Sequence, residues 1–156
     1  MNHSTNISDS ASMVIQGFCP LCWHIPSDED FVQLCGFVGS VPEFVCGSDA
    51  AKIAKALAST TGWNTAPQFD CVVGNNLSTN NASGFSALPA GSWPLGYYWY
   101  DRNYGKEALF WTSTISTNYT YYNPQIFLRA LRYNETDLDE SDSRRSSGFS
   151  VRCVCD

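Results

Sequence analysis

The pattern of apolar and polar positions divides the chain near residue 62 into a helical first part and a strand-rich second part. In the first part, Ser27 precedes three acidic residues and the apolar positions Phe31 and Leu34. A serine followed three residues later by a carboxylate is typical of a helix N-terminus, because each side chain caps backbone N–H groups there. We therefore predict a helix that begins after Ser27 and ends at about Gly36 or Gly39.

A second helix is expected from Ser48 or Asp49, either of which would act as the N-cap, through Ala58. Ile53 and Leu57, each followed by an alanine, recur at the spacing of one helical face. That face would pack on the core.

After Gly62 the helical period disappears. The stretch Gly74–Gly84 is rich in turn-forming residues and predicts a polar loop. Short β-strands are expected from there on, most clearly at Phe110–Ile115, Phe127–Tyr133 and Phe149–Cys155. Two helices followed by strands predict an α+β fold, with the helices packed to one side of an antiparallel sheet.

All eight tyrosines of the chain lie between residues 97 and 133. An aromatic core explains part of this window, and we assign Phe110, Trp111 and Phe127 to it. The runs 97–100 and 119–122 contain consecutive aromatics. Burying all of these rings would require both faces of a strand to be covered, which is difficult in so small a chain. Several of these rings are therefore expected on the surface, where clustered aromatics mark an interaction site.

Composition limits the partners. The 156 residues are enough for one domain, only 15% are charged, and the net charge is −6. No basic patch is available to replace counterions on nucleic acid or on an anionic membrane. The chain has no apolar run long enough to insert into a membrane, and residues 1–16 form a polar tail without the features of a secretory signal.

Seven cysteines favour an oxidising compartment, and the odd number leaves at least one thiol unpaired. Cys19 and Cys22 form a C-x-x-C pair, but four residues separate it from Ser27, whereas a redox pair needs a helix N-terminus. With Cys153 and Cys155 the same pair would make a zinc site, for which C-x-C is a poor half. We expect disulfides and no metal or cofactor.

Other candidate chemistry is weak. The acidic run 135–142 lacks the glycine turn and final glutamate of an EF-hand, so a solvated loop is expected. His24 is interpreted as a framework residue and not as a general base. No nucleophile, base and orienting group can be combined, which argues against an enzyme. Six N-x-S/T sequences would matter only in a eukaryotic secretory host.

Six stretches, in order, carry a family resemblance: GFCPLCWHIPSDEDFVQL, AKALASTTGW, CVVGNN, NNASGFSALPAG, FWTST and GFSVRC. Together they strongly resemble the Fibrobacter succinogenes major paralogous domain, a C-type-lectin-like domain of gut Bacteroidetes and their phages. The resemblance implies a lectin-like domain over residues 17–156, with a framework at 17–92, a variable binding region at 93–147 and a closing strand at 148–155. Residues 1–16 precede it.

Some members of this family are variable proteins of diversity-generating retroelements, in which adenines near the 3′ end of the gene are randomised. Many positions between 93 and 147 hold residues that such codons encode. By this resemblance the binding residues alternate with framework positions in the last third of the chain. They are Trp93, Tyr97, Tyr98, Trp99, Tyr119, Tyr121, Tyr122, Leu128, Arg132 and Asn134.

The family also aligns four cysteines, which implies the disulfides Cys19–Cys153 and Cys46–Cys71. Cys22 and Cys155 would form a further bridge and leave Cys35 unpaired. The implied function is recognition of a protein or glycan ligand on another cell or virion, by a domain displayed on a bacterial surface or a phage. The alternative is a structural module of a larger surface or pilus protein with no ligand of its own.

Overall fold

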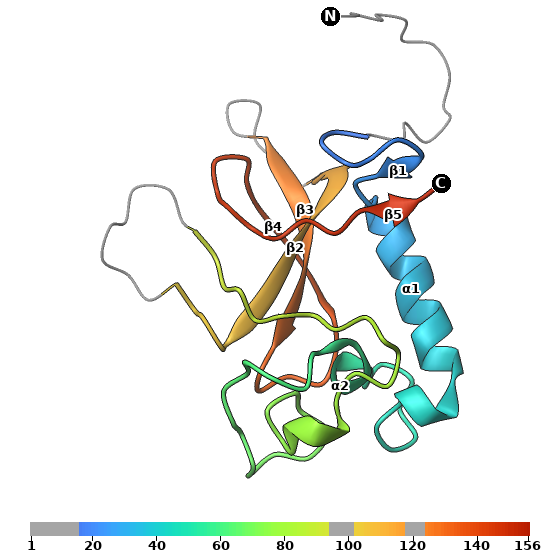
Figure 1. Cartoon of the computed structure of the whole chain (residues 1–156), viewed down its shortest axis with the longest axis vertical. Helices are drawn as coiled ribbons and strands as arrows, with labels where there is room; N and C mark the ends of the chain where they lie inside the picture. Colours follow the sequence, from blue (N-terminus) through green and yellow to red (C-terminus); the bar gives the residue numbers. More distant parts are fainter. Residues whose placement is uncertain (1–15, 94–101, 118–123) are drawn as a thin grey trace, which may run out of the picture.

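The computed structural model describes residues 16–93, 102–117 and 124–156. It confirms the α+β class: one long helix, α1 (Asp28–Ser40), lies beside an antiparallel sheet of β2 (Glu107–Ile115), β3 (Gln125–Arg132) and β4 (Asp139–Arg144) (Figure 1). The short strands β1 (Trp23–His24) and β5 (Val154–Cys155) form a second sheet near the start of α1. Among the described residues, none of the helices has the length and apolar character needed to cross a bilayer.

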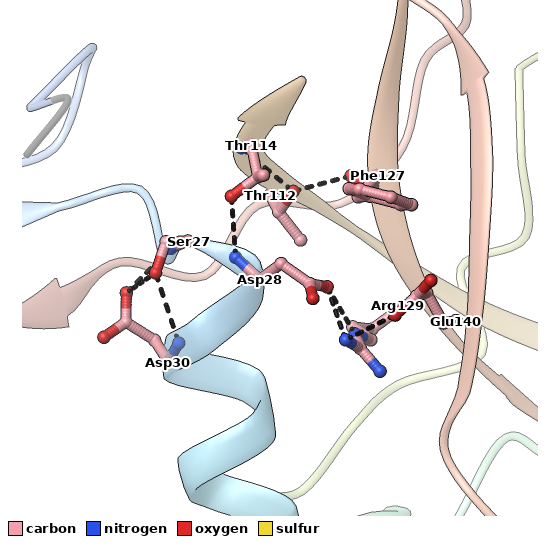
Figure 2. A network of polar contacts seen from close by, with 8 residues as sticks. All are labelled: Ser27, Asp28, Asp30, Thr112, Thr114, Phe127, Arg129 and Glu140. Carbon is pink, nitrogen blue, oxygen red and sulfur yellow. Dashed lines mark hydrogen bonds and ion pairs between the residues drawn. The ribbon is translucent and has the colours of Figure 1, made fainter. Parts of the chain in front are cut away.

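The predicted capping of α1 is confirmed. Oγ of Ser27 accepts a hydrogen bond from the Asp30 backbone N–H at 3.2 Å, and Oδ2 of Asp30 accepts one from the Ser27 N–H at 2.7 Å (Figure 2). Two backbone donors that the helix itself leaves unpaired are thereby satisfied. The helix continues one residue past Gly39, the later of the two expected ends.

An ion-pair network holds the start of α1 against the sheet. Arg129 on β3 has only 6% of its surface exposed, and its Nε donates to Oδ1 of Asp28 at 2.9 Å. Its Nη2 also contacts Glu140 on β4 at 3.1 Å, and the Asp28 backbone N–H donates to Oγ1 of Thr114 on β2 at 2.9 Å (Figure 2). One buried guanidinium therefore joins the helix to two strands.

The prediction of a solvated loop at 135–142 is wrong for its second half, since β4 begins at Asp139. β4 pairs with β3 from Gln125↔Arg144 to Ala130↔Asp139. Its acidic side chains are matched by arginines of β3, Glu140 by Arg129 and Asp139 by Arg132. Cross-strand charge pairs thus replace the apolar alternation by which strands are usually recognised.

The sheet buries both of its faces. Phe110 and Leu131 join α1 and the helical first part in the main core, whereas Leu109, Leu128 and Ala130 form a smaller cluster on the opposite face. Phe110 is core as expected, but Trp111 and Phe127 are only half-buried. Phe127 is the third residue of β3 and pairs with Asp142 of β4.

The second helix is much shorter than expected, because α2 spans only Ala54–Leu57. Asp49 does not cap it: Oδ1 of Asp49 accepts from the Ala51 N–H at 3.1 Å, which closes a local turn. The Ala54 N–H donates instead to the carbonyl of Thr136 at 2.9 Å. Ser48 and Asp49 therefore belong to a loop, and a tertiary contact sets where α2 begins.

The polar loop predicted at Gly74–Gly84 is present and contains a short 3₁₀ helix, η2 (Leu77–Thr79). Lys55 organises it: its Nζ donates to Oδ1 of Asn80 at 2.8 Å and to the carbonyl of Asn75. Burial lowers the pKa of Lys55 below its ordinary value.

Two disulfides connect distant parts of the chain, Cys19–Cys153 and Cys46–Cys71, as the resemblance implied. The further bridge between Cys22 and Cys155 is not formed, and both are exposed free thiols. In the β1–β5 register Cys155 faces Trp23, and Cys22 pairs only through its carbonyl with the Asp156 N–H. Of the strand expected at Phe149–Cys155, only β5 is regular.

Candidate recognition surface

Four of the ten expected binding residues lie in the described part of the chain: Trp93, Leu128, Arg132 and Asn134. The other six, Tyr97, Tyr98, Trp99, Tyr119, Tyr121 and Tyr122, lie outside the described residues. These six lie in two segments, 94–101 and 118–123, and the structure describes the residues on either side of each segment.

A backbone hydrogen bond joins the residues that flank each segment. The Ser92 N–H donates to the carbonyl of Arg102 at 2.9 Å, and the Ser116 N–H donates to the carbonyl of Gln125 at 3.0 Å. Gly91 permits the first closure: it has φ +68, and a Cβ there would lie 1.9 Å from the Arg102 carbonyl oxygen. The framework thus fixes both ends of both segments.

Residues 144–148, which we call the crossing loop, bring these two pairs of ends together. At its start Arg144 pairs with Gln125 in the sheet. At its end Gly148 exchanges two hydrogen bonds with Trp93, of 2.8 and 2.9 Å. The chain then continues past the sheet toward β5 (Figure 1). Only three residues separate the contact with one segment from the contact with the other.

Trp93, one of the expected binding residues, has 52% of its area exposed. The guanidinium of Arg102 stacks on its ring, 3.4 Å from the centroid. Trp93, Tyr104 and Phe149 line a shallow hollow of about 170 Å³, and Tyr104 is 60% exposed. A tryptophan and a tyrosine thus reach solvent beside the first segment.

A second hollow, of about 380 Å³, lies beside the second segment. Ile115 and Ile126, from the ends of β2 and β3, line it together with Phe18 and Arg145. Trp111 also lines it, and the Trp111 ring lies 4.7 Å from that of Phe149, which lines the first hollow. One aromatic pair therefore stands between the two hollows. We call these residues together the candidate recognition surface: Trp93, Arg102, Tyr104 and Phe149 at the first hollow, and Phe18, Trp111, Ile115, Ile126 and Arg145 at the second.

Leu128 is not on this surface, contrary to the expectation. It is 3% exposed, opposite Trp111 in the sheet, in the cluster against which Trp111 and Phe149 pack. The expected alternation of binding and framework positions does not hold at Leu128, because the segment that follows the crossing loop covers this face of β3. Leu128 supports the floor of the surface and does not contact solvent.

Arg132 and Asn134 lie at the opposite end of β3 from the crossing loop. Arg132 forms ion pairs with Asp139 and, at 3.8 Å, with Glu107. Oε1 of Glu107 accepts from Nδ2 of Asn103 at 2.7 Å, beside Arg102. Arg132 is thus connected to the base of the first segment, while Asn134 is an exposed residue beyond the strand.

Sequence reasoning missed Arg102, Tyr104 and Arg145 as members of the surface. The adjacent arginines Arg144 and Arg145 were a usable signal, since basic pairs are rare in a chain with a net charge of −6. Tyr104 belonged to the aromatic window, but the turn residues around it gave no reason to select it.

His24 is held by two carboxylates. Its Nδ1 lies 2.6 Å from Oδ1 of Asp156 and its Nε2 lies 3.4 Å from Oδ2 of Asp30. The hydrogen bond to Asp156 raises the pKa of His24 above its ordinary value, against the effect of burial, and Asp30 adds to the rise. These contacts join β1, the α1 cap and the chain beyond β5, as a framework residue would.

The disulfide pairing is relevant to the redox and zinc alternatives for the C-x-x-C and C-x-C pairs. The Cys19–Cys153 disulfide uses one cysteine of the C-x-x-C pair and one of the C-x-C pair. Within the described ranges no three His, Cys, Asp or Glu side chains are grouped so that they would hold a metal ion.

The family model of the Fibrobacter succinogenes major domain matches residues 6–155. The chain belongs to this family. The match begins at residue 6, inside the segment that we predicted as a tail before the domain. Searches of curated proteins and of solved structures give no match.

Proposed function

We propose that this member of the Fibrobacter succinogenes major domain family is a ligand-recognition domain that binds a protein or glycan through the candidate recognition surface. The observation that carries the proposal is the double pairing of the crossing loop, with Gln125 at one end and Trp93 at the other. The two segments that hold most of the tyrosines begin and end at one place on the framework. Binding loops on a rigid scaffold are typical of recognition domains.

The chemistry of the described surface supports binding. Exposed tryptophan and tyrosine rings provide large contact areas at small entropic cost, and arginine is the cation most enriched at interfaces. The first hollow is lined mainly by aromatic side chains and the second by aliphatic and aromatic ones, and His24 is bound on both sides by carboxylates. We therefore propose recognition and not catalysis.

We further propose that the fold is C-type-lectin-like and that residues 93–147 are diversified. A short two-stranded sheet that joins the ends of the domain, one long helix and a compact antiparallel sheet support the first proposal. The many positions between 93 and 147 that hold residues encoded by mutated adenine codons support the second. Two disulfides support display in an oxidising setting, outside the bacterial cell or on a virion.

Sequencing around the gene tests diversification directly. We expect a reverse-transcriptase gene and a near-identical template repeat that matches the codons for the last third of the chain. If neither is present, and if independent isolates carry the same residues at 97–99 and 119–122, the variable-protein proposal fails and the structural module becomes the better account.

Substitution tests binding. Once a cognate ligand has been captured, Tyr97→Ala, Tyr98→Ala and Tyr121→Ala should each weaken it by roughly tenfold or more, as hot-spot residues do. The melting temperature should remain within about 2 °C of the wild type. Unchanged affinity in all three variants would contradict the proposed surface.

A further inference from the structure

Three arginines at the candidate recognition surface have no carboxylate partner among the described residues. Arg102 stacks on Trp93, and Arg144 and Arg145 are exposed on the crossing loop. Within the described residues, no ion pair involves any of the three.

Four other cations of the described chain have partners inside the fold. Arg129 and Arg132 pair with carboxylates, and Lys55 and Arg152 donate to backbone carbonyls. Asp142, the acidic residue of β4 closest in sequence to the crossing loop, accepts a hydrogen bond from Ser116 at 2.7 Å. In a chain with a net charge of −6, the three arginines that lack a carboxylate partner among residues 16–93, 102–117 and 124–156 therefore make this surface locally positive.

The arginines stand beside the two hollows. Arg102 contacts Trp93, which lines the first, and Arg145 itself lines the second. The Trp111–Phe149 pair lies between them. Aromatic side chains at the centre with arginines around them are the composition that protein interfaces favour.

We propose that this surface binds an acidic segment of a partner protein, with carboxylates facing Arg102 and Arg145 and apolar side chains in the hollows. The inference rests on the proposed function and adds the chemical class of the ligand. A stacked guanidinium keeps its N–H edges free for a carboxylate, and its position is already restricted before binding. Charge complementarity of this kind speeds association and selects partners.

The lining of the second hollow favours a protein over an acidic glycan. Phe18, Ile25, Ile115 and Ile126 offer aliphatic and aromatic surface there. A sugar would leave hydroxyl groups without hydrogen-bond partners against such a wall, whereas a leucine or tyrosine side chain would gain from burial.

A random copolymer of glutamate and tyrosine is a suitable probe, with binding measured by calorimetry at low and at physiological salt. We expect the wild-type chain to bind it, and to bind more weakly as salt rises. Arg102→Ala and Arg145→Ala should each weaken binding roughly two- to fivefold, as rim charges do. Lys52→Ala, which removes the same charge before α2, should leave binding unchanged. Thermal melting of each variant checks that the fold is intact.

Polygalacturonate, an acidic glycan, completes the experiment. No binding of the copolymer, or binding that both arginine variants leave unchanged, would overturn the inference. Equal, arginine-dependent binding of polygalacturonate would overturn the choice of a protein partner in favour of an acidic glycan. A cognate ligand that depends on the tyrosines but not on Arg102 or Arg145 would overturn the charge inference while the proposed function stands.

Discussion

Arg129 and Asp28 are 101 residues apart in the chain, and the guanidinium of one donates to the carboxylate of the other at 2.9 Å. Asp28 is the first residue of α1, where a negative charge is also favoured by the helix dipole. The contact therefore connects the framework helix with the central strand that follows the second tyrosine segment.

Loss of the ion pair between Arg129 and Asp28 should lower the stability of the fold. Arg129 is buried, so Arg129→Ala leaves Asp28 and Glu140 without their cation and should lower the free energy of unfolding by about 3 kcal/mol. Urea unfolding followed by circular dichroism, with the disulfides intact, measures it. Arg144→Ala is the control, since that exposed side chain should change stability by no more than about 0.5 kcal/mol. Equal effects of the two would contradict a structural role for the pair.

Thiol labelling should distinguish three classes of cysteine. Native protein treated with iodoacetamide should be modified quickly at Cys22 and Cys155, which are exposed. Cys35 should react slowly, because burial raises the pKa of its thiol, an effect that Arg129 only partly offsets. The remaining four should react only after reduction, and peptide mass spectrometry identifies each site. Protection of Cys22 and Cys155 together would indicate the bridge that the structure does not form.

The stability of the α1 cap should depend on pH in two directions. The pKa of His24 is raised, so its contribution is complete below the unfolded value of about 6.5 and is lost as pH rises through the folded pKa. Burial opposes ionisation of Asp30, but hydrogen bonds from Ser27 outweigh it and the pKa of Asp30 is lowered. That contribution is present above the unfolded pKa and is lost as pH falls through the folded one.

His24→Gln tests the first of these effects. The variant should lose stability relative to the wild type in mildly acidic solution, and the difference should shrink as the pH is raised above neutrality. Urea midpoints measured from pH 5 to pH 9 give the comparison. A difference that grows with pH would contradict the assigned contacts to Asp156 and Asp30.

Local signals allowed parts of this fold to be predicted. The capping of α1 by Ser27 and Asp30 involves residues three apart and needs no knowledge of the rest of the chain. The start of α2 depends on Thr136, far along the sequence, and could not be read from residues 48–58. β4 was missed because its acids pair with arginines of β3, a match that is visible only when the strands are adjacent.

The candidate recognition surface was also predictable only where no distant residue decides the exposure of a side chain. Trp93 was expected among the binding residues by the family resemblance, and the structure leaves it half exposed. Leu128 was selected by alternation along a strand, which reports which residues share a face but not what covers that face. Phe149, twenty-one positions later, packs with Trp111 on that side.

Trp93 and Leu128 should therefore respond differently to substitution. Leu128→Ala removes a buried side chain and should cost about 3 kcal/mol of unfolding free energy. Trp93→Ala removes a half-exposed ring and its stacking with Arg102, and should cost about 1 kcal/mol. Denaturant unfolding of both variants gives the ranking, which a binding role for Leu128 on the surface would reverse.

The central claim is that the clustered tyrosines face outward from a framework that holds their segments at both ends. Photochemically induced nuclear polarisation tests it without a ligand, because only tyrosine and tryptophan rings reachable by a dissolved dye give enhanced NMR signals. We expect enhancement of Tyr97, Tyr98, Tyr119, Tyr121 and Tyr122 in the folded protein, with the half-buried Tyr133 weaker. If those five rings give no enhancement until the protein is unfolded, they are core residues and the recognition account is contradicted.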